Sequence, residues 1–267
     1  KKRMFALLTE GRTCEFLRLL AHEDVNQQQS KSNLSLLHVA VIENHESVVE
    51  EMLKLPQLRV NALDSVGRTP LYIASTRGRS IIVKLLLTDS RIDPNKAGNI
   101  GTTPLHDTCS NDKDDKLLEN MRLLMNCNRI DPNRVDSYKM GPLHAACRRS
   151  QKLSVQILLS HPDTNPNILD NMHKKPLHYV CFPNTSLESF DMIELVEILL
   201  EDERTELEVE EAKDYVYNKE DPIQIELGFL FGKYKAINPS EIFTEPKIIE
   251  VVANRLKLLR SKSAYVF

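Results

Sequence analysis

Three histidine–cysteine pairs with one spacing are the residues of this sequence best suited to chemistry. They are His106 with Cys109, His144 with Cys147, and His178 with Cys181. Residues three apart share a helix face, and imidazole with thiolate is a common ligand set for zinc. The pairs recur after 38 and then 34 residues, so each sits on a separate structural unit, roughly 10 Å from the next. Metal–ligand bonds are only about 2.0–2.3 Å long. We therefore expect no zinc site, and we interpret the cysteines as small buried side chains.

Catalytic and nucleotide-binding motifs are absent from the sequence. It contains no GxxxxGK[ST] loop, no GxSxG elbow, no HExxH and no GxGxxG. Residues Gly98 to Gly101 read as a simple turn. No two carboxylates stand together on an apolar background, as acid–base catalysis would require. We expect a protein that is not an enzyme and that uses no cofactor and no metal.

Composition and charge describe a folded protein without a membrane span. Of the 267 residues, 41% are hydrophobic and 27% are charged, and the net charge is −3. These values are typical of a globular protein and disfavour a general nucleic-acid binder. No window approaches 18 uncharged apolar residues, so we expect no membrane insertion.

The five cysteines are scattered and odd in number, which indicates reduced thiols rather than a disulfide framework. We therefore expect a cytoplasmic protein, with the nucleus as the alternative compartment. The chain begins with Lys1 rather than Met, and we interpret it as a processed or excised piece of a longer protein.

An internal repeat predicts the helices that carry the histidine and cysteine pairs. A six-residue motif occurs five times, with its second residue at positions 36, 70, 104, 142 and 176. A second marker, an asparagine after Val or Pro, keeps the same interval at Asn61, Asn95, Asn133 and Asn167. Thr69 and Thr103 suit a helix N-cap, and the proline that follows each suits the first helical position. Apolar residues at helical spacing then predict a second helix in each unit.

This pattern resembles the ankyrin repeat family, whose motif T-P-L-H-x-A opens the first of two antiparallel helices after a β-turn. The resemblance covers about Met4 to Leu200. It implies an all-α ankyrin-repeat solenoid of antiparallel helix pairs with β-turn fingers. We expect repeats 1–6 in residues 1–205, with repeat 1 as an N-terminal cap. Residues 206–267 are expected to form an acidic loop and a degenerate repeat or C-terminal cap, which opens at residues 221–225 and continues in a second helix at 248–259.

Departures from the family pattern predict local irregularities. The links between repeats lack the family's glycine, and extra residues occur around 111–116 and 182–190. Thr108 and Val180 replace the small alanine of the first helix in those same two repeats, so we expect irregular packing there. The resemblance implies that the motif histidines stabilise turns. It also implies that the repeated asparagines tie the hairpins, with hydroxylation of these asparagines as the alternative.

A partner-binding surface is expected on the concave side, where the resemblance places fingertips and exposed first-helix residues. The fingertip positions are Ser32, Val66, Ile100, Tyr138 and Met172, of which four are apolar. Beside the tips lie Arg68, Met140 and Lys174, and on the first helices Arg77, Arg148, Arg149 and Phe182. Apolar tips beside arginines favour a protein or peptide with acidic and apolar anchors. The alternatives are tips packed on neighbouring fingers and an ordinary solvated face.

Residues 201–221 concentrate the negative charge. This segment has ten acidic and three basic residues, a net charge of −7, which leaves +4 for the rest of the chain. A solvated linker is the simplest interpretation. The alternatives are a contact for a basic partner and an internal mask for the arginines.

We therefore predict a non-enzymatic protein–protein interaction module, with a monomer as the expected state. A first alternative is a regulatory ankyrin segment of a larger signalling protein of kinase or GTPase type. A second is a small-ligand or oligonucleotide binder that uses the arginines. An enzyme that acts through the cysteine and histidine pairs is the last alternative.

Overall fold

The computed structural model describes residues 2–109, 112–181, 189–216, 222–243 and 252–253. Within these ranges the chain is helical, with no β-strand and one isolated antiparallel bridge between Gln28 and Ser35. The all-α solenoid expected from the repeat is confirmed. No helix in the described part of the chain is both long and apolar enough to cross a membrane.

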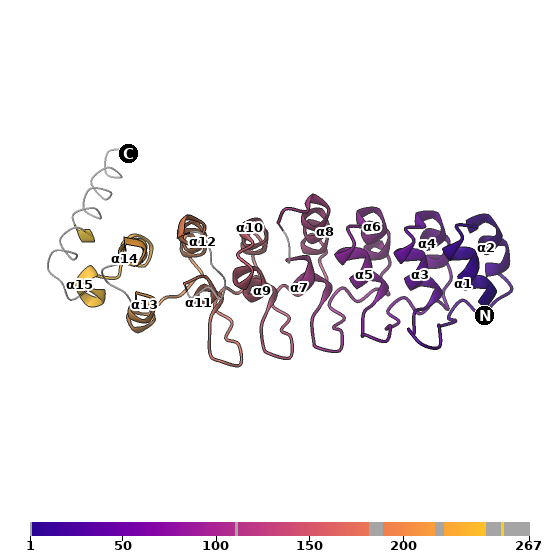
Figure 1. Ribbon diagram of the computed structural model, residues 1–267, viewed down its shortest axis with the longest axis horizontal. Helices are drawn as coiled ribbons and strands as arrows, with labels where there is room; N and C mark the ends of the chain where they lie inside the picture. The colour runs from indigo at the N-terminus through magenta and orange to yellow at the C-terminus, as the bar shows by residue number, and fades with distance from the viewer. Residues whose placement is uncertain (1, 110–111, 182–188, 217–221, 244–251, 254–267) are drawn as a thin grey trace.

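The described helices stand in pairs, side by side in a single elongated row, with the N-terminus at one end (Figure 1). The inner helices are α1 (Lys2–Thr9), α3 (Leu36–Ile42), α5 (Pro70–Thr76), α7 (Pro104–Thr108), α9 (Pro142–Arg148), α11 (Pro176–Cys181) and α13 (Val209–Tyr215). The outer helices are α2 (Thr13–Leu20), α4 (Glu46–Leu53), α6 (Ser80–Thr88), α8 (Asp115–Met125), α10 (Lys152–Leu159), α12 (Ser189–Glu201) and α14 (Pro222–Lys235). A short helix, α15 (Pro239–Ile242), follows.

Each inner helix begins at the repeated motif for local reasons. Proline occupies the first helical position of α5, α7, α9 and α11, where the absent N–H costs no hydrogen bond. The Thr69 hydroxyl caps α5 by accepting from the Tyr72 N–H. The motif leucine points into the core in all five copies and is at most 3% exposed, at Leu37, Leu71, Leu105, Leu143 and Leu177. Neighbouring helices pack on one another from α1 to α11 in the inner row and from α2 to α14 in the outer row, so one continuous core runs along the stack.

The missing link glycine is replaced by an arginine from the next repeat. The Arg91 guanidinium donates to the carbonyls of Leu53 and Leu55 at the C-terminal end of α4, at 2.7 and 2.8 Å. Arg129 and Arg204 cap α6 and α10 in the same way. The last carbonyls of a helix have no partner within it. These arginines supply one, and a left-handed glycine cap is therefore not needed.

The repeated asparagines tie consecutive hairpins together. Asn95 donates to the carbonyl of Arg129 at 2.7 Å and accepts from the Asp131 N–H at 2.8 Å. Asn26, Asn61, Asn133 and Asn167 make the equivalent pair of bonds to the following hairpin. Both polar atoms of each amide are engaged, which confirms the tying role expected of Asn61, Asn95, Asn133 and Asn167.

The insertion near residue 112 supplies a side chain that caps a helix of the next repeat. The Asp112 carboxylate accepts from the Ser154 N–H at 3.1 Å and from the Leu153 N–H, both in the first turn of α10. It also accepts from the Ser154 hydroxyl at 2.5 Å. A side chain 41 residues away in sequence therefore caps a helix of the next repeat. The second insertion lies largely outside the described residues.

The acidic segment corrects an expectation, because it is helical where a loop was predicted. Helix α13 begins after Glu208, whose backbone N–H donates to the Glu211 carboxylate. Ala212, Tyr215 and Val216 are buried, and the Tyr215 ring lies 5.7 Å from that of His178 in α11. Apolar residues every three or four positions therefore dock this acidic helix on the stack.

The helix that begins at Pro222 also differs from the expectation. It was predicted to open the first helix of the seventh pair, but α14 packs on the outer helix α12 and extends the outer row. The helix expected at 248–259 lies almost entirely outside the described residues.

Candidate partner-binding surface

Hairpin loops, here called fingers, project from one edge of the stack (Figure 1), and those before α3, α5, α7, α9 and α11 carry the predicted tip residues. We number them finger 1 (residues 29–34), finger 2 (64–68), finger 3 (98–102), finger 4 (136–140) and finger 5 (170–174). The apolar tips are exposed: Val66 by 57%, Ile100 by 61%, Tyr138 by 64% and Met172 by 71%. Ser32, at the tip of finger 1, is half-buried. The apolar tips of fingers 2 to 5 are therefore open to solvent rather than packed on their neighbours.

An aspartate shapes fingers 2, 4 and 5. The Asp64 carboxylate accepts from the backbone N–H groups of Val66 and Arg68 at 2.9 and 2.8 Å. Asp136 and Asp170 make the same two bonds in fingers 4 and 5. Burial opposes the ionisation of Asp64, but the bonds from Arg68 and Val66 outweigh it and hold its pKa below the usual value. The tips of fingers 2, 4 and 5 are thus fixed by carboxylates beneath them.

Backbone bonds connect finger 1 to finger 2, finger 3 to finger 4, and finger 4 to finger 5. The Ser65 N–H donates to the Ser32 carbonyl at 2.9 Å, and the Asn171 N–H donates to the Tyr138 carbonyl at 2.9 Å. The Ser137 N–H donates to the Ile100 carbonyl at 3.1 Å. These bonds set the spacing of the tips and reduce the entropy that a partner must overcome on binding.

The motif histidines hold each finger against the preceding helix. The Nε2 atoms of His38, His106 and His144 lie 2.9, 3.0 and 3.0 Å from the carbonyls of Arg68, Met140 and Lys174. Each Nδ1 atom accepts a backbone N–H three residues earlier. Both ring nitrogens are therefore occupied by backbone groups, and the expected turn-stabilising role is confirmed.

The same geometry argues against the zinc hypothesis. Cys109, Cys147 and Cys181 are buried, and burial raises the pKa of each thiol. A protonated thiol and a fully hydrogen-bonded imidazole are poor ligands. Among the described residues, no three His, Cys, Asp or Glu side chains lie close enough to hold a metal ion.

The basic side chains beside the tips are only partly free. Arg77, Arg148 and Arg149 are exposed, and we call these three the arginine row. Arg68 is 39% exposed in its side chain and pairs with the Asp64 carboxylate at 2.8 Å. Lys174 is half-buried. The arginine row therefore carries the basic charge that is most available to a partner.

Met140 corrects a predicted surface position. Its side chain is only 6% exposed, and its sulfur lies 3.7 Å from an Arg148 guanidinium nitrogen. An apolar thioether gains by leaving water, whereas the charged Arg68 at the equivalent place stays partly in it. Met140 thus supports Arg148 from below. Phe182, the remaining predicted residue, lies outside the described residues.

The acidic helix α13 contacts a lysine rather than the arginine row. The Glu211 carboxylate pairs with the Lys175 ammonium at 2.9 Å. Within the described ranges, no carboxylate of this helix forms an ion pair with Arg77, Arg148 or Arg149. The internal mask considered for the acidic segment is therefore not seen in this arrangement.

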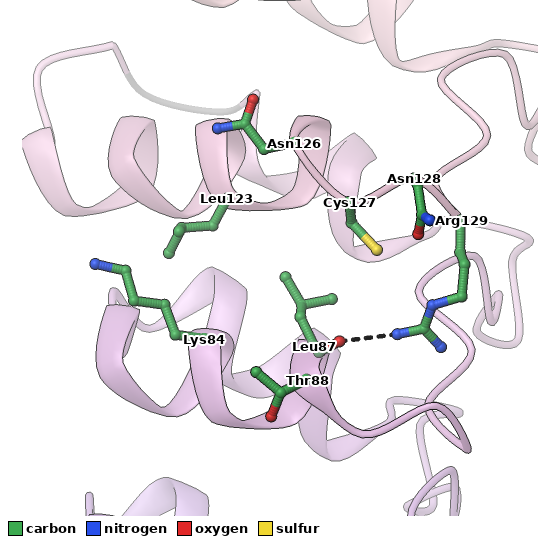
Figure 2. A pocket seen from close by; sticks show the side chains of 8 residues that line it. All are labelled: Lys84, Leu87, Thr88, Leu123, Asn126, Cys127, Asn128 and Arg129. Carbon is green, nitrogen blue, oxygen red and sulfur yellow. Dashed lines mark hydrogen bonds between the residues drawn. The ribbon is translucent and has the colours of Figure 1, made fainter.

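Besides a hollow of about 310 Å³ between α4 and α6, two hollows on opposite sides of the stack bear on the choice of binding face. The larger, of about 510 Å³, lies between α6 and α8 on the outer row and includes Lys84, Leu87, Leu123 and Cys127 (Figure 2). One wall is the Arg129 guanidinium, which donates to the Leu87 carbonyl at 2.9 Å. Because Arg129 caps α6, this wall is part of the scaffold.

The second hollow, of about 160 Å³, lies between fingers 2 and 3 on the predicted binding face. Val66, Arg68, Tyr72, Gly98, Asn99, Ile100 and Thr102 line it. Sequence reasoning found Val66, Arg68 and Ile100 but missed Tyr72, Gly98, Asn99 and Thr102 as site residues. The available indication was Gly98 itself, which stands where Asp64, Asp136 and Asp170 stand in the other fingers.

Solved structures with the same fold support the architecture. The chain is similar to the ankyrin repeat protein EF0377, with a TM-score of 0.62 and 19% identity over 73% of this chain and 95% of that one. It is also similar to the ankyrin repeat domain of Bcl-3, a member of the IkappaB protein family. That comparison gives a TM-score of 0.65 and 21% identity over 76% of this chain and 86% of that one.

One curated protein gives a local sequence match. A transient receptor potential cation channel subfamily A member 1 homolog of Caenorhabditis elegans is 33% identical over 98 residues, which are 36% of this chain. The matched region spans only 8% of that protein.

The family match covers most of the chain. A family model described as ankyrin repeats (3 copies) matches residues 4–98, 60–136, 82–170 and 105–211. Together with the helix pairs, the fingers and the histidine and asparagine ties, this match shows that the chain belongs to the ankyrin repeat family.

Proposed function

We propose that this protein is a non-enzymatic interaction module that binds a peptide or protein segment across its fingertips and inner helices. Ankyrin repeats generally serve protein–protein interaction. The single observation that carries the proposal is the row of four apolar tips, each more than half exposed, of which those of fingers 2, 4 and 5 are fixed from beneath. Exposed apolar groups on a rigid edge are typical of recognition surfaces.

The arginine row supports a partner with acidic as well as apolar anchors. Arg148 and Arg149 are exposed at the end of α9, and Arg77 is exposed after α5. Arginine pairs well with carboxylates through two parallel hydrogen bonds. The partner that fits is an extended or helical segment with apolar side chains toward the tips and acidic ones toward the inner helices.

The test is selection of ligands from a displayed library of random peptides, followed by affinity measurement on charge-reversal variants. We expect enrichment of peptides that combine acidic and apolar residues. The double variant Arg148→Glu with Arg149→Glu should bind them at least about tenfold more weakly while it keeps its helical circular dichroism. A matched control reverses two exposed outer-helix arginines, Arg18→Glu with Arg122→Glu, and should bind normally. Equal affinity for both double variants would contradict the proposal.

A second candidate is that this chain is the ankyrin segment of a larger signalling protein. The match to a short part of a much longer channel-type protein favours it. Sequencing the full reading frame of the transcript tests it, because a further catalytic or membrane domain in the same frame is expected. A frame that encodes only ankyrin repeats would contradict it.

A further inference from the structure

The hollow between fingers 2 and 3 has the size and lining of a side-chain subsite. Its volume is about 160 Å³, close to the roughly 150 Å³ of an apolar protein cavity that holds benzene. The side chains of Val66, Tyr72 and Ile100 give it apolar walls. A group up to the size of a phenyl ring therefore fits.

Finger 3 lacks the carboxylate that the neighbouring fingers use. It makes the same turn, because the Gly98 N–H donates to the Thr102 carbonyl at 2.9 Å, as the Asp64 N–H does to the Arg68 carbonyl at 3.0 Å. In finger 2, Asp64 then accepts from the N–H groups two and four residues on. Gly98 has no side chain to do this, so the N–H groups of Ile100 and Thr102 have no acceptor among the described residues.

The connection between fingers 2 and 3 is also incomplete. Fingers 1 and 2, 3 and 4, and 4 and 5 are each joined by a backbone N–H to carbonyl bond. The equivalent bond would run from the Asn99 N–H to the Val66 carbonyl, and it is missing from the described backbone bonds. Both residues line the hollow. The hollow therefore combines apolar walls with backbone donors and an acceptor that no group of the described chain uses.

Charge decides what kind of group fits. Among the described residues that line the hollow, only Arg68 is charged, and its guanidinium is already paired with the Asp64 carboxylate at 2.8 Å. The Tyr72 hydroxyl donates to the Asp107 carboxylate. A further carboxylate would find no unpaired cation among the described lining residues, and it would come near Asp64 and Asp107, the partners of Arg68 and Tyr72. A neutral carbonyl meets no such repulsion. The electrostatics therefore favour a neutral group that carries its own acceptor and donor.

We propose that this hollow is the anchor subsite for an extended peptide. It takes one apolar side chain of up to phenyl size, while the peptide backbone pairs with the free N–H and C=O groups of fingers 2 and 3. In this binding mode, backbone bonds supply affinity and a pocket supplies specificity. The inference rests on the proposed function, because it specifies where on the same face a partner is held.

The test uses capped single residues as probes, with amide resonances as the readout. N-acetyl-phenylalanine N-methylamide carries the apolar group and the backbone, the glycine analogue carries the backbone alone, and the aspartate analogue adds a carboxylate. The phenylalanine probe should shift the amides of Val66, Asn99, Ile100 and Thr102. The other two probes should bind at least about tenfold more weakly.

Two substitutions of one residue form the matched pair. Gly98→Ala and Gly98→Asp both add a Cβ, which would lie 3.0 Å from the Gly67 carbonyl oxygen. The steric effect of this Cβ on finger 2 is therefore the same in both variants. Only Gly98→Asp supplies a carboxylate that accepts the Ile100 and Thr102 N–H groups, as Asp64 does in finger 2. Gly98→Asp should therefore bind the phenylalanine probe about tenfold more weakly than Gly98→Ala does.

The outcomes separate this subsite from the general function. If library peptides bind through the arginine row while the phenylalanine probe leaves the finger 3 amides unchanged, the subsite is wrong and the proposed function stands. Equal binding of the probe by Gly98→Ala and Gly98→Asp also contradicts the subsite. If the arginine-row variant binds every selected peptide normally, the proposed function itself fails.

Discussion

Single arginines do at the repeat boundaries what a glycine does elsewhere in the family. Arg91 donates to the carbonyls of Leu53, Leu55 and Pro56 and pairs with the Asp89 carboxylate at 2.5 Å. Its side chain is 32% exposed, so water screens part of this interaction. The pKa of Asp89 is lowered, first by the hydrogen bond from Arg91.

Replacement of Arg91 by alanine tests this role. The variant leaves the end of α4 without its cap and Asp89 without its partner. We expect the free energy of unfolding in urea to fall by about 1–3 kcal/mol. The control, Arg59→Ala, removes an exposed arginine of the preceding link. It should change the free energy of unfolding by less than about 0.5 kcal/mol. Similar losses for the two variants would show that Arg91 is not a cap.

The buried histidines make stability depend on pH. Burial lowers the pKa of His38, His106 and His144. At pH values between that lowered pKa and the ordinary histidine pKa of about 6.5, these three histidines bind more protons in the unfolded chain than in the folded one. The contribution of the neutral histidines to the free energy of unfolding is therefore fully present above about pH 7, and it falls as the pH drops through 6.5.

We predict a lower urea midpoint at pH 5.5 than at pH 7.5, with each buried histidine contributing at most about 1.4 kcal/mol per pH unit. His144→Gln should be less stable at pH 7.5 but should lose less on acidification. His22→Gln, at an exposed position, should keep the full pH dependence. An unchanged pH dependence in His144→Gln would contradict the role given to its ring.

Helices in this stack are capped across repeats as well as within them. The clearest case is Asp112, which lies in the insertion between α7 and α8 and caps α10. Asp112→Ala should lower the free energy of unfolding by about 1 kcal/mol and speed amide hydrogen exchange at Leu153 and Ser154. Asp115→Ala, exposed in the first turn of α8, is the control. Unchanged exchange in α10 would show that Asp112 does not cap it.

The inner helices could be predicted from sequence because their start has a local cause. Proline at the first helical position and a capping Thr69 are readable from the residues alone. Helix α13 was missed because it has neither proline nor the motif leucine, and its acidic side chains suggested a linker. The pair Glu208 and Glu211, three apart as in a capping box, was the available indication.

Exposure of the candidate site was only partly predictable. Val66, Ile100, Tyr138 and Met172 follow from the repeat register, since a fingertip points away from the stack. Met140 occupies the same register as Arg68, yet one is buried and the other is not. The difference depends on the chemistry of the side chain and on Arg148 of the next inner helix. The position of a residue in the repeat therefore does not by itself predict whether its side chain is buried.

At the scale of the whole molecule, the stack offers two different faces. The finger edge carries exposed apolar tips, a small apolar hollow and the arginine row. The outer face carries the larger hollow between α6 and α8, one wall of which is a capping arginine (Figure 2). The near-neutral net charge of −3 conceals an acidic segment of −7 and a remainder of +4. These differences support the proposal that recognition takes place at the finger edge.

The most direct test of this assignment is a hydrogen-exchange footprint of the whole chain with and without a peptide selected from the library. We predict slower exchange in fingers 2 to 5 and at the end of α9, with α4, α6 and α8 unchanged. A footprint confined to the outer helices around Lys84 and Leu123 would contradict the account.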